Sequence, residues 1–188
     1  MRNLRLQTRF LGLLVGPLAL AAVGFNALPA DAGDITTCPP GEDCHEAPIM
    51  DARIAGKAAG PFIGAGEYDE SGADEIVLKN IKEKKTKSFY IRSVNVGDDG
   101  DVQWDGTGSS PCFKVTYVMG AWDVTSFVVN GTLAGAFGAG DQLDLRLDVK
   151  AKACSNPGDV ATTLLDVSPT TGGLDHDRVR ARVTVIPA

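Results

Sequence analysis

The chain has 188 residues, with 18 basic and 24 acidic side chains and a formal net charge of −6 at pH 7. This length favours a single domain, and the negative charge argues against nonspecific binding to nucleic acid, which needs a basic surface. Apolar residues make up 44% of the sequence, which is ordinary for a globular protein and excludes a wholly disordered chain.

Residues 1–32 have the pattern of a secretory signal peptide. Three arginines form a basic start, residues 11–23 are almost wholly apolar, and residues 30–32 (Ala-Asp-Ala) match the pattern of a signal peptidase site. An uncleaved membrane anchor is the alternative, but a spanning helix needs about 20 apolar residues and this apolar segment is shorter and contains a proline. We therefore predict export to the medium or the periplasm, with membrane contact only during export.

Residues 33–50 are rich in proline, glycine and acidic residues, and we predict that they form an arm pinned by a disulfide. All four cysteines follow the predicted cleavage site: Cys38, Cys44, Cys112 and Cys154. An even number of cysteines in an exported chain indicates disulfides, and of the three possible pairings we favour Cys38–Cys44 with Cys112–Cys154. A metal site made by Cys38, Cys44 and His45 is the alternative, although this spacing matches no common zinc motif.

From about residue 50 onward, short segments of alternating apolar and polar residues are separated by clusters of Gly, Asn and Asp, which is typical of antiparallel strands with one buried face. In one such segment Phe89 and Ile91 face one way, and Tyr90 and Arg92 face the other. The predicted strands comprise residues 76–78, 88–96, 102–104, 113–117, 143–149, 160–167 and 179–185. Only residues 123–129 suit a helical turn.

About seven strands with hardly any helix predict an all-β domain over residues 51–188, either a two-sheet sandwich or a barrel. The irregular strand spacing favours the antiparallel β-sandwich. Several segments together resemble secreted bacterial immunoglobulin-like modules, similar to the cell-adhesion-related domains of bacteria; they are residues 60–64, 68–72, 89–97, 106–117, 123–125 and 138–140. The resemblance departs from the usual pattern where Ala139-Gly140 replaces Pro-Gly. It implies an immunoglobulin-like fold and a structural, adhesive or presentation role.

The sequence contains none of the common catalytic or nucleotide-binding motifs, neither G-x-S-x-G, H-E-x-x-H, a P-loop nor G-x-G-x-x-G. Of its two histidines, His45 adjoins the arm cysteines, and His176 lies between two aspartates in a predicted exposed turn. We therefore predict a protein that is not an enzyme and has no cofactor.

Four aspartates surround Gly100, namely Asp98, Asp99, Asp101 and Asp105. Several carboxylates around a glycine turn are the kind of ligands that calcium prefers. The spacing of an EF-hand is absent, however, and Asp and Gly are also common in hydrated turns. Calcium binding here is therefore the alternative to a simple solvated turn.

Aromatic residues are sparse, and their positions suggest different roles. Trp104 and Tyr117 share strand faces with apolar residues and are predicted to lie in the core, whereas Trp122 follows Gly120-Ala121 in a loop and is the best candidate for an exposed ligand contact. The leading hypothesis is an exported, non-enzymatic immunoglobulin-like module that contacts a protein or glycan surface at the cell envelope or in the medium. The alternative is a carbohydrate-binding β-sandwich that uses Trp122.

Overall fold

The computed structural model describes residues 47–68, 71–170 and 176–188. The predicted signal peptide (1–32), both arm cysteines and most of the predicted arm (33–50) lie outside these residues, so the cleavage, the Cys38–Cys44 pairing and the domain boundaries stay predictions. Within the described part of the chain, no helix is long and apolar enough to cross a membrane.

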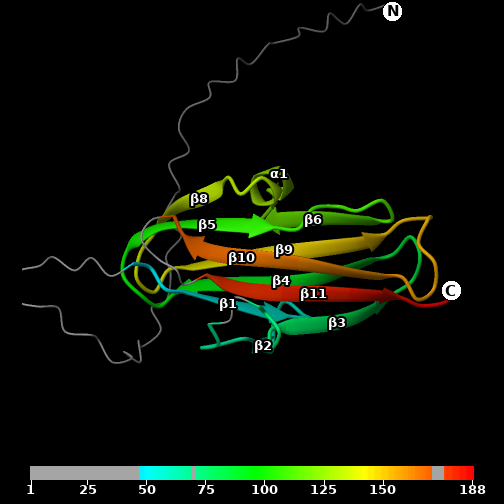
Figure 1. Ribbon diagram of the computed structural model, residues 1–188, viewed down its shortest axis with the longest axis horizontal. Coiled ribbons are helices and arrows are strands. Elements are labelled where there is room, and N and C mark those ends of the chain that lie inside the picture. The colour runs from blue at the N-terminus through cyan, green and yellow to red at the C-terminus, as the bar shows by residue number, and fades with distance from the viewer. Residues whose placement is uncertain (1–46, 69–70, 171–175) are drawn as a thin grey trace, which may run out of the picture.

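The described residues form eleven strands and one short helix, and the strands run along the long axis of the molecule (Figure 1). In chain order the elements are β1 (Met50–Ala55), β2 (Phe62–Ile63), β3 (Ile76–Ile81), β4 (Thr86–Asn95), β5 (Gly100–Gly106), β6 (Phe113–Met119), β7 (Trp122–Asp123), α1 (Thr125–Val129), β8 (Leu133–Phe137), β9 (Gln142–Ala151), β10 (Val160–Pro169) and β11 (Asp177–Val185).

Two sheets pack face to face, which confirms the predicted all-β sandwich. One sheet has six strands in the order β2-β1-β4-β9-β6-β7, and the other has five in the order β3-β11-β10-β5-β8. The strand pairs are antiparallel except β3 and β11, which run parallel. This pair corrects the expectation of a purely antiparallel fold. β3 and β11 lie far apart in the sequence, so no hairpin turn forces them to run in opposite directions.

All seven predicted strands are present, and β1, β2, β7 and β8 are additional. β1 alternates apolar Met50, Ala52 and Ile54 with charged Asp51 and Arg53, although the predicted strands did not include it; in the structure Asp51 is buried as well as Ala52. β8 consists of Leu-Ala-Gly-Ala-Phe, whose central residues have low strand propensity. β2 and β7 have only two residues each. β2, β7 and β8 lack the alternation on which the prediction depended.

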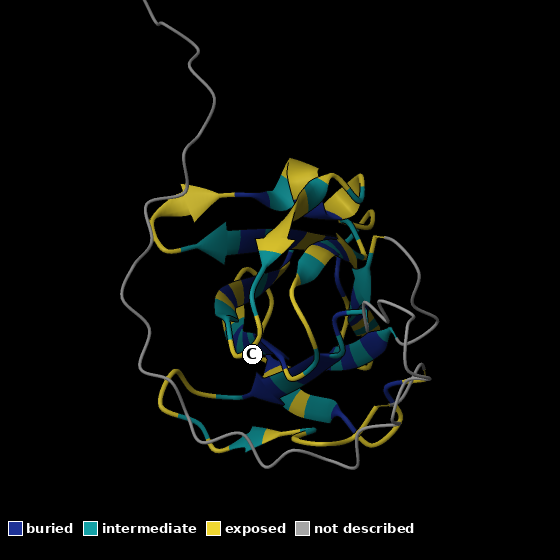
Figure 2. Ribbon diagram, turned by 90° about the vertical axis from the view of Figure 1, so that its left-hand side faces the viewer, coloured by how far each residue is buried: buried dark blue, intermediate teal, exposed yellow. Residues whose placement is uncertain are grey.

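The core lies between the two sheets and is built from the inward-facing residues of each strand. Seen from one end, the strands enclose a single interior, and α1 and β8 expose much of their surface at one border (Figure 2). Trp104 is buried, donates from Nε1 to the Ser93 hydroxyl at 3.1 Å, and meets the Phe137 ring edge to face at 5.4 Å. Tyr117 is fully buried. Both aromatic residues are therefore core residues, as predicted.

Gly106, the last residue of β5, allows the two sheets to approach closely. A Cβ added at this position would lie 2.6 Å from the Tyr117 hydroxyl oxygen and 2.7 Å from Cγ1 of Val128. We expect Gly106→Ala to lower the free energy of unfolding by about 1–3 kcal/mol through overpacking, measured by urea denaturation. Gly135→Ala is the matched control, because an added Cβ there meets nothing within 4 Å. Equal stability of the two variants would contradict the prediction.

Candidate functional site

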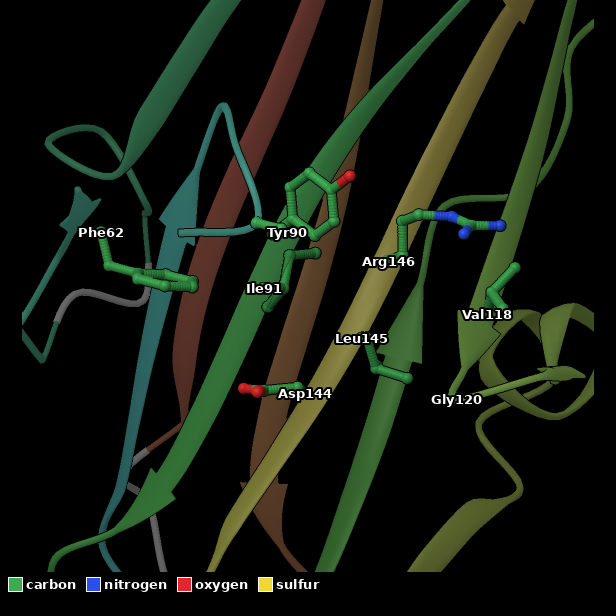
Figure 3. Close-up of a pocket in the computed structure, with 9 residues that line it drawn as sticks. Phe62, Tyr90, Ile91, Val118, Gly120, Asp144, Leu145 and Arg146 are labelled. Atoms are coloured by element: carbon green, nitrogen blue, oxygen red, sulfur yellow. The ribbon is translucent and has the colours of Figure 1, made fainter. Parts of the chain in front are cut away.

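The outward surface of the six-stranded sheet contains a hollow of about 260 Å³. β4 and β9 form its floor, with Phe62 on one side and Val118 and Gly120 on the other (Figure 3), and Ala58 also lines it. The remaining lining residues come from the two floor strands: Tyr90, Ile91, Asp144, Leu145 and Arg146. The hollow therefore draws on segments that are widely separated in the sequence.

The register of the sheet brings the outward side chains of the hollow into one row. Tyr90 on β4 is paired with Arg146 on β9, and Arg146 is paired with Val118 on β6. Cross-strand partners project from the same face of a sheet. An aromatic ring, a guanidinium group and an aliphatic side chain thus lie side by side, while Phe89 and Leu147, also paired across β4 and β9, point into the core.

The next pair of outward-facing residues along these strands is Arg92 on β4 and Asp144 on β9, and hydrogen bonds hold the Asp144 carboxylate in place. Arg92 donates to it from Nε at 2.9 Å and from Nη2 at 3.2 Å, and Gln142 donates from Nε2 at 3.2 Å to each of its oxygens. The Arg92 guanidinium also lies over the Phe62 ring, 4.6 Å from its centre. Arg92 therefore positions both an aromatic side chain and an acidic side chain of the hollow.

The polar groups of the hollow keep bonding capacity for a ligand. Arg146 donates from Nε to Asp148 at 3.2 Å, which orients the guanidinium but leaves its terminal nitrogens without a hydrogen bond among the described residues. The Tyr90 hydroxyl has no hydrogen-bond partner in the described part of the chain. Asp144 points toward β4 and Arg146 toward β6 (Figure 3), so an acceptor and a donor lie on opposite sides of β9.

Trp122 lies outside this hollow. It begins β7 directly after the turn at Gly120-Ala121, so its predicted place in a loop is wrong, but the residue is 76% exposed, as predicted. β7 pairs with β6 so that Met119 faces Trp122 and Val118 faces Asp123. Because strand residues alternate between faces, Trp122 lies on the face opposite to that of Val118 and the hollow. Its role as a ligand contact stays a prediction.

The four aspartates around Gly100 are not brought together as metal ligands. Asp99 accepts a hydrogen bond from the Ala139 amide at 2.7 Å and so ties the turn before β5 to the turn after β8. Asp101 and Asp105 are exposed on β5, four residues apart. Among the described residues, no group of three or more His, Cys, Asp or Glu side chains could hold a metal ion. Calcium binding stays a prediction, with no preformed site in these residues.

Two buried carboxylates that the sequence analysis did not single out connect β1 to its surroundings. Asp177, at the start of β11, accepts a hydrogen bond from the Ala52 amide at 2.6 Å and thereby joins the two sheets. Asp51 forms an ion pair with Arg53 at 2.5 Å, and this hydrogen bond raises the pKa of Arg53 above its ordinary value. Asp51 also accepts from the Gly66 amide at 3.2 Å. These hydrogen bonds offset the cost of burying the two carboxylates.

The disulfide between Cys112 and Cys154 is present and confirms the predicted pairing, with the two Cα atoms 5.3 Å apart. It links the segment just before β6 to the segment just after β9, two neighbouring strands of the six-stranded sheet. The Lys152 amide donates to the Cys112 carbonyl at 2.9 Å beside it. A disulfide of this kind is typical of proteins from oxidising compartments.

No protein-family model and no curated protein matches the sequence. Among solved structures, similarity is found to a family 123 glycoside hydrolase from Clostridium perfringens, with 9% identity over 74% of this chain and 27% of the hydrolase and a TM-score of 0.48. The VesB protease of Vibrio cholerae shares 13% identity over 60% of this chain and 30% of the protease, with a TM-score of 0.38. A PapD-like domain of human CEP192 shares 11% identity over 83% of this chain and 98% of the domain, also with a TM-score of 0.38.

These comparisons correct one prediction. The expectation that the protein is not an enzyme is withdrawn, since the structures similar to it include a glycoside hydrolase and a protease. The chain spans less than a third of the length of either enzyme. At this level of identity and TM-score the similarities assign neither a reaction nor catalytic residues to the present chain, so the chemistry of its own surface must carry any functional argument.

Proposed function

We propose that this protein is an exported immunoglobulin-like module that binds a partner at the cell envelope or in the medium. In this proposal the outer face of the six-stranded sheet is the binding surface. The observation that carries it is the hollow itself, in which aromatic, guanidinium and carboxylate groups converge on one exposed face. Concave sites with apolar walls and a few placed polar groups are the usual form of ligand sites.

The construction of the hollow supports binding over a merely solvated surface. Its polar side chains project from the long central strands β4 and β9, which hold their geometry better than loops do. Arg92 and Gln142 restrain Asp144, and Asp148 restrains Arg146. Because these contacts already restrain the side chains, ligand binding costs less of their conformational entropy.

The basic and apolar pattern of residues 1–32 supports export, and the Cys112–Cys154 disulfide is compatible with it. An exported module with an exposed binding face would meet envelope components or secreted molecules. We therefore expect the partner to lie outside the cytoplasm.

The test is cosedimentation of the purified protein with cell-envelope material from the organism that produces it. We expect the wild-type protein to be retained, and the double variant Tyr90→Ala/Arg146→Ala to lose at least about tenfold in affinity because two ligand contacts are removed. Thr162→Ala/Arg182→Ala is the matched control, because it alters exposed residues of the other sheet, on β10 and β11. Absence of retention of the wild-type protein, or equal retention of all three, would refute the proposal.

A further inference from the structure

The chemistry of the hollow defines the class of its ligand, and this step rests on the proposed function. We infer that the hollow binds a neutral sugar ring of a glycan. Phe62 and Tyr90 supply the apolar contact surface, and Asp144 and Arg146 supply hydrogen bonds to sugar hydroxyls. The site lies on the opposite face from Trp122, the residue that the sequence alone favours.

The balance of charge around the hollow favours an uncharged ligand. Two guanidinium groups, Arg92 and Arg146, lie beside two carboxylates: Arg92 forms an ion pair with Asp144 across β4 and β9, and Arg146 forms one with Asp148 along β9. An anionic ligand would meet the carboxylates and a cationic ligand would meet the guanidinium groups, each at a cost in free energy. A neutral ligand meets no such repulsion.

Hydroxyl groups suit the remaining hydrogen-bonding capacity of the site. Asp144 accepts and Arg146 donates on opposite sides of β9, and different hydroxyls of one sugar can bind each, because a hydroxyl both donates and accepts. The Tyr90 hydroxyl can also donate or accept. A purely apolar ligand would desolvate these groups without replacing their hydrogen bonds to water, which opposes binding. A ligand with an apolar ring face and a rim of hydroxyls satisfies both parts of the hollow.

The size and position of the hollow agree with a single sugar ring within a longer glycan. Its volume of about 260 Å³ lies just below the range of about 300–1,000 Å³ that is usual for drug-sized ligands. The floor strand β9 is paired on both sides, with β4 and with β6. An extended peptide that adds a strand needs a free sheet edge, so the centre of this sheet disfavours that kind of partner.

The direct test is isothermal titration of the purified protein with soluble glucose- and N-acetylglucosamine-based hexasaccharides. We expect Tyr90→Ala to weaken binding of the recognised sugar about tenfold, through loss of the aromatic contact. Tyr90→Phe should have a smaller effect, because it keeps the ring. Trp122→Ala is the control, an exposed aromatic on the other face, and should bind like the wild type. A loss of affinity in Trp122→Ala with none in Tyr90→Ala would overturn the assignment of the site.

Treatment of the envelope material separates this inference from the proposed function. Periodate cleaves vicinal diols of sugars, whereas protease removes protein partners. If periodate abolishes retention of the wild-type protein and protease does not, the glycan inference is supported even when neither hexasaccharide is the correct sugar. If protease abolishes retention and periodate does not, the ligand is a protein: the glycan inference fails and the proposed function stands. If untreated material retains nothing, both fail.

Discussion

Replacement of Tyr117 by alanine is expected to lower the free energy of unfolding by about 4 kcal/mol. The Tyr117 side chain projects from β6 into the core, where it is fully buried. Removal of the ring would leave a cavity between the two sheets, and the rigid strands around it can collapse only in part. Urea denaturation followed by circular dichroism measures the loss.

The Tyr117 hydroxyl adds a specific link between the sheets. It lies 3.1 Å from the carbonyl oxygens of Thr107 and Leu164, the second of which belongs to β10 in the other sheet. Tyr117→Phe keeps the ring and removes this link, so we expect a smaller loss of about 1–2 kcal/mol. Tyr68→Phe is the control, because the Tyr68 side chain is 54% exposed, and it should change stability little. Equal losses in Tyr117→Phe and Tyr68→Phe would contradict this role.

The same residue predicts a pH dependence of stability. Burial raises the pKa of Tyr117 above its ordinary value, and the nearby carboxylates of Asp105 and Asp166 add to the shift. An unfolded tyrosine loses its proton near pH 10, while the folded protein still holds it. The contribution of Tyr117 is therefore fully present below about pH 10 and declines as the pH rises above it. The stability gap between wild type and Tyr117→Phe should narrow from about pH 8 to about pH 11. A difference in stability that stays constant over this pH range would contradict the raised pKa of Tyr117.

Loss of the Cys112–Cys154 disulfide is the second large effect. The bond joins residues 42 positions apart. In the chain-entropy account, a closed loop of this length stabilises the folded state by roughly 4 kcal/mol, because it restricts the unfolded chain. We expect Cys112→Ser/Cys154→Ser to lose most of this amount in urea denaturation under non-reducing conditions.

Reductant provides the internal control for the disulfide. In the presence of dithiothreitol, the free energy of unfolding of the wild-type protein should fall to about that of the double variant. The double variant lacks this disulfide, so reduction of the bond cannot lower its stability. The Lys152 ammonium group already connects the same two segments. It donates to the carbonyl oxygen of Ser110 at 2.9 Å and to that of Pro111 at 3.1 Å. If these contacts alone held the segments, the double variant would be as stable as the wild type, and the prediction would be wrong.

The strand pattern was predictable because alternation is a local property. In β9, Leu145, Leu147 and Val149 alternate with charged residues, and in the structure they are buried. The outward direction of Tyr90 and Arg92 followed in the same way from their neighbours in the chain. The exposure of Trp122 and the burial of Trp104 could also be anticipated, since each depends on the residues immediately around it.

Pairing between strands is not a local property, and it determined the features of the fold and of the hollow that the sequence did not predict. Nothing in the sequence indicates that β3 lies parallel to β11. Nor does it indicate that Asp51 of β1 is buried beside Arg53 of the same strand, or that the Ala52 amide donates to Asp177 of the other sheet. The sequence by itself determined which residues form most strands and which way their side chains point. Only the tertiary structure decided that Phe62, Tyr90, Arg146 and Val118 share one hollow, because that depends on the order and register in which distant strands meet.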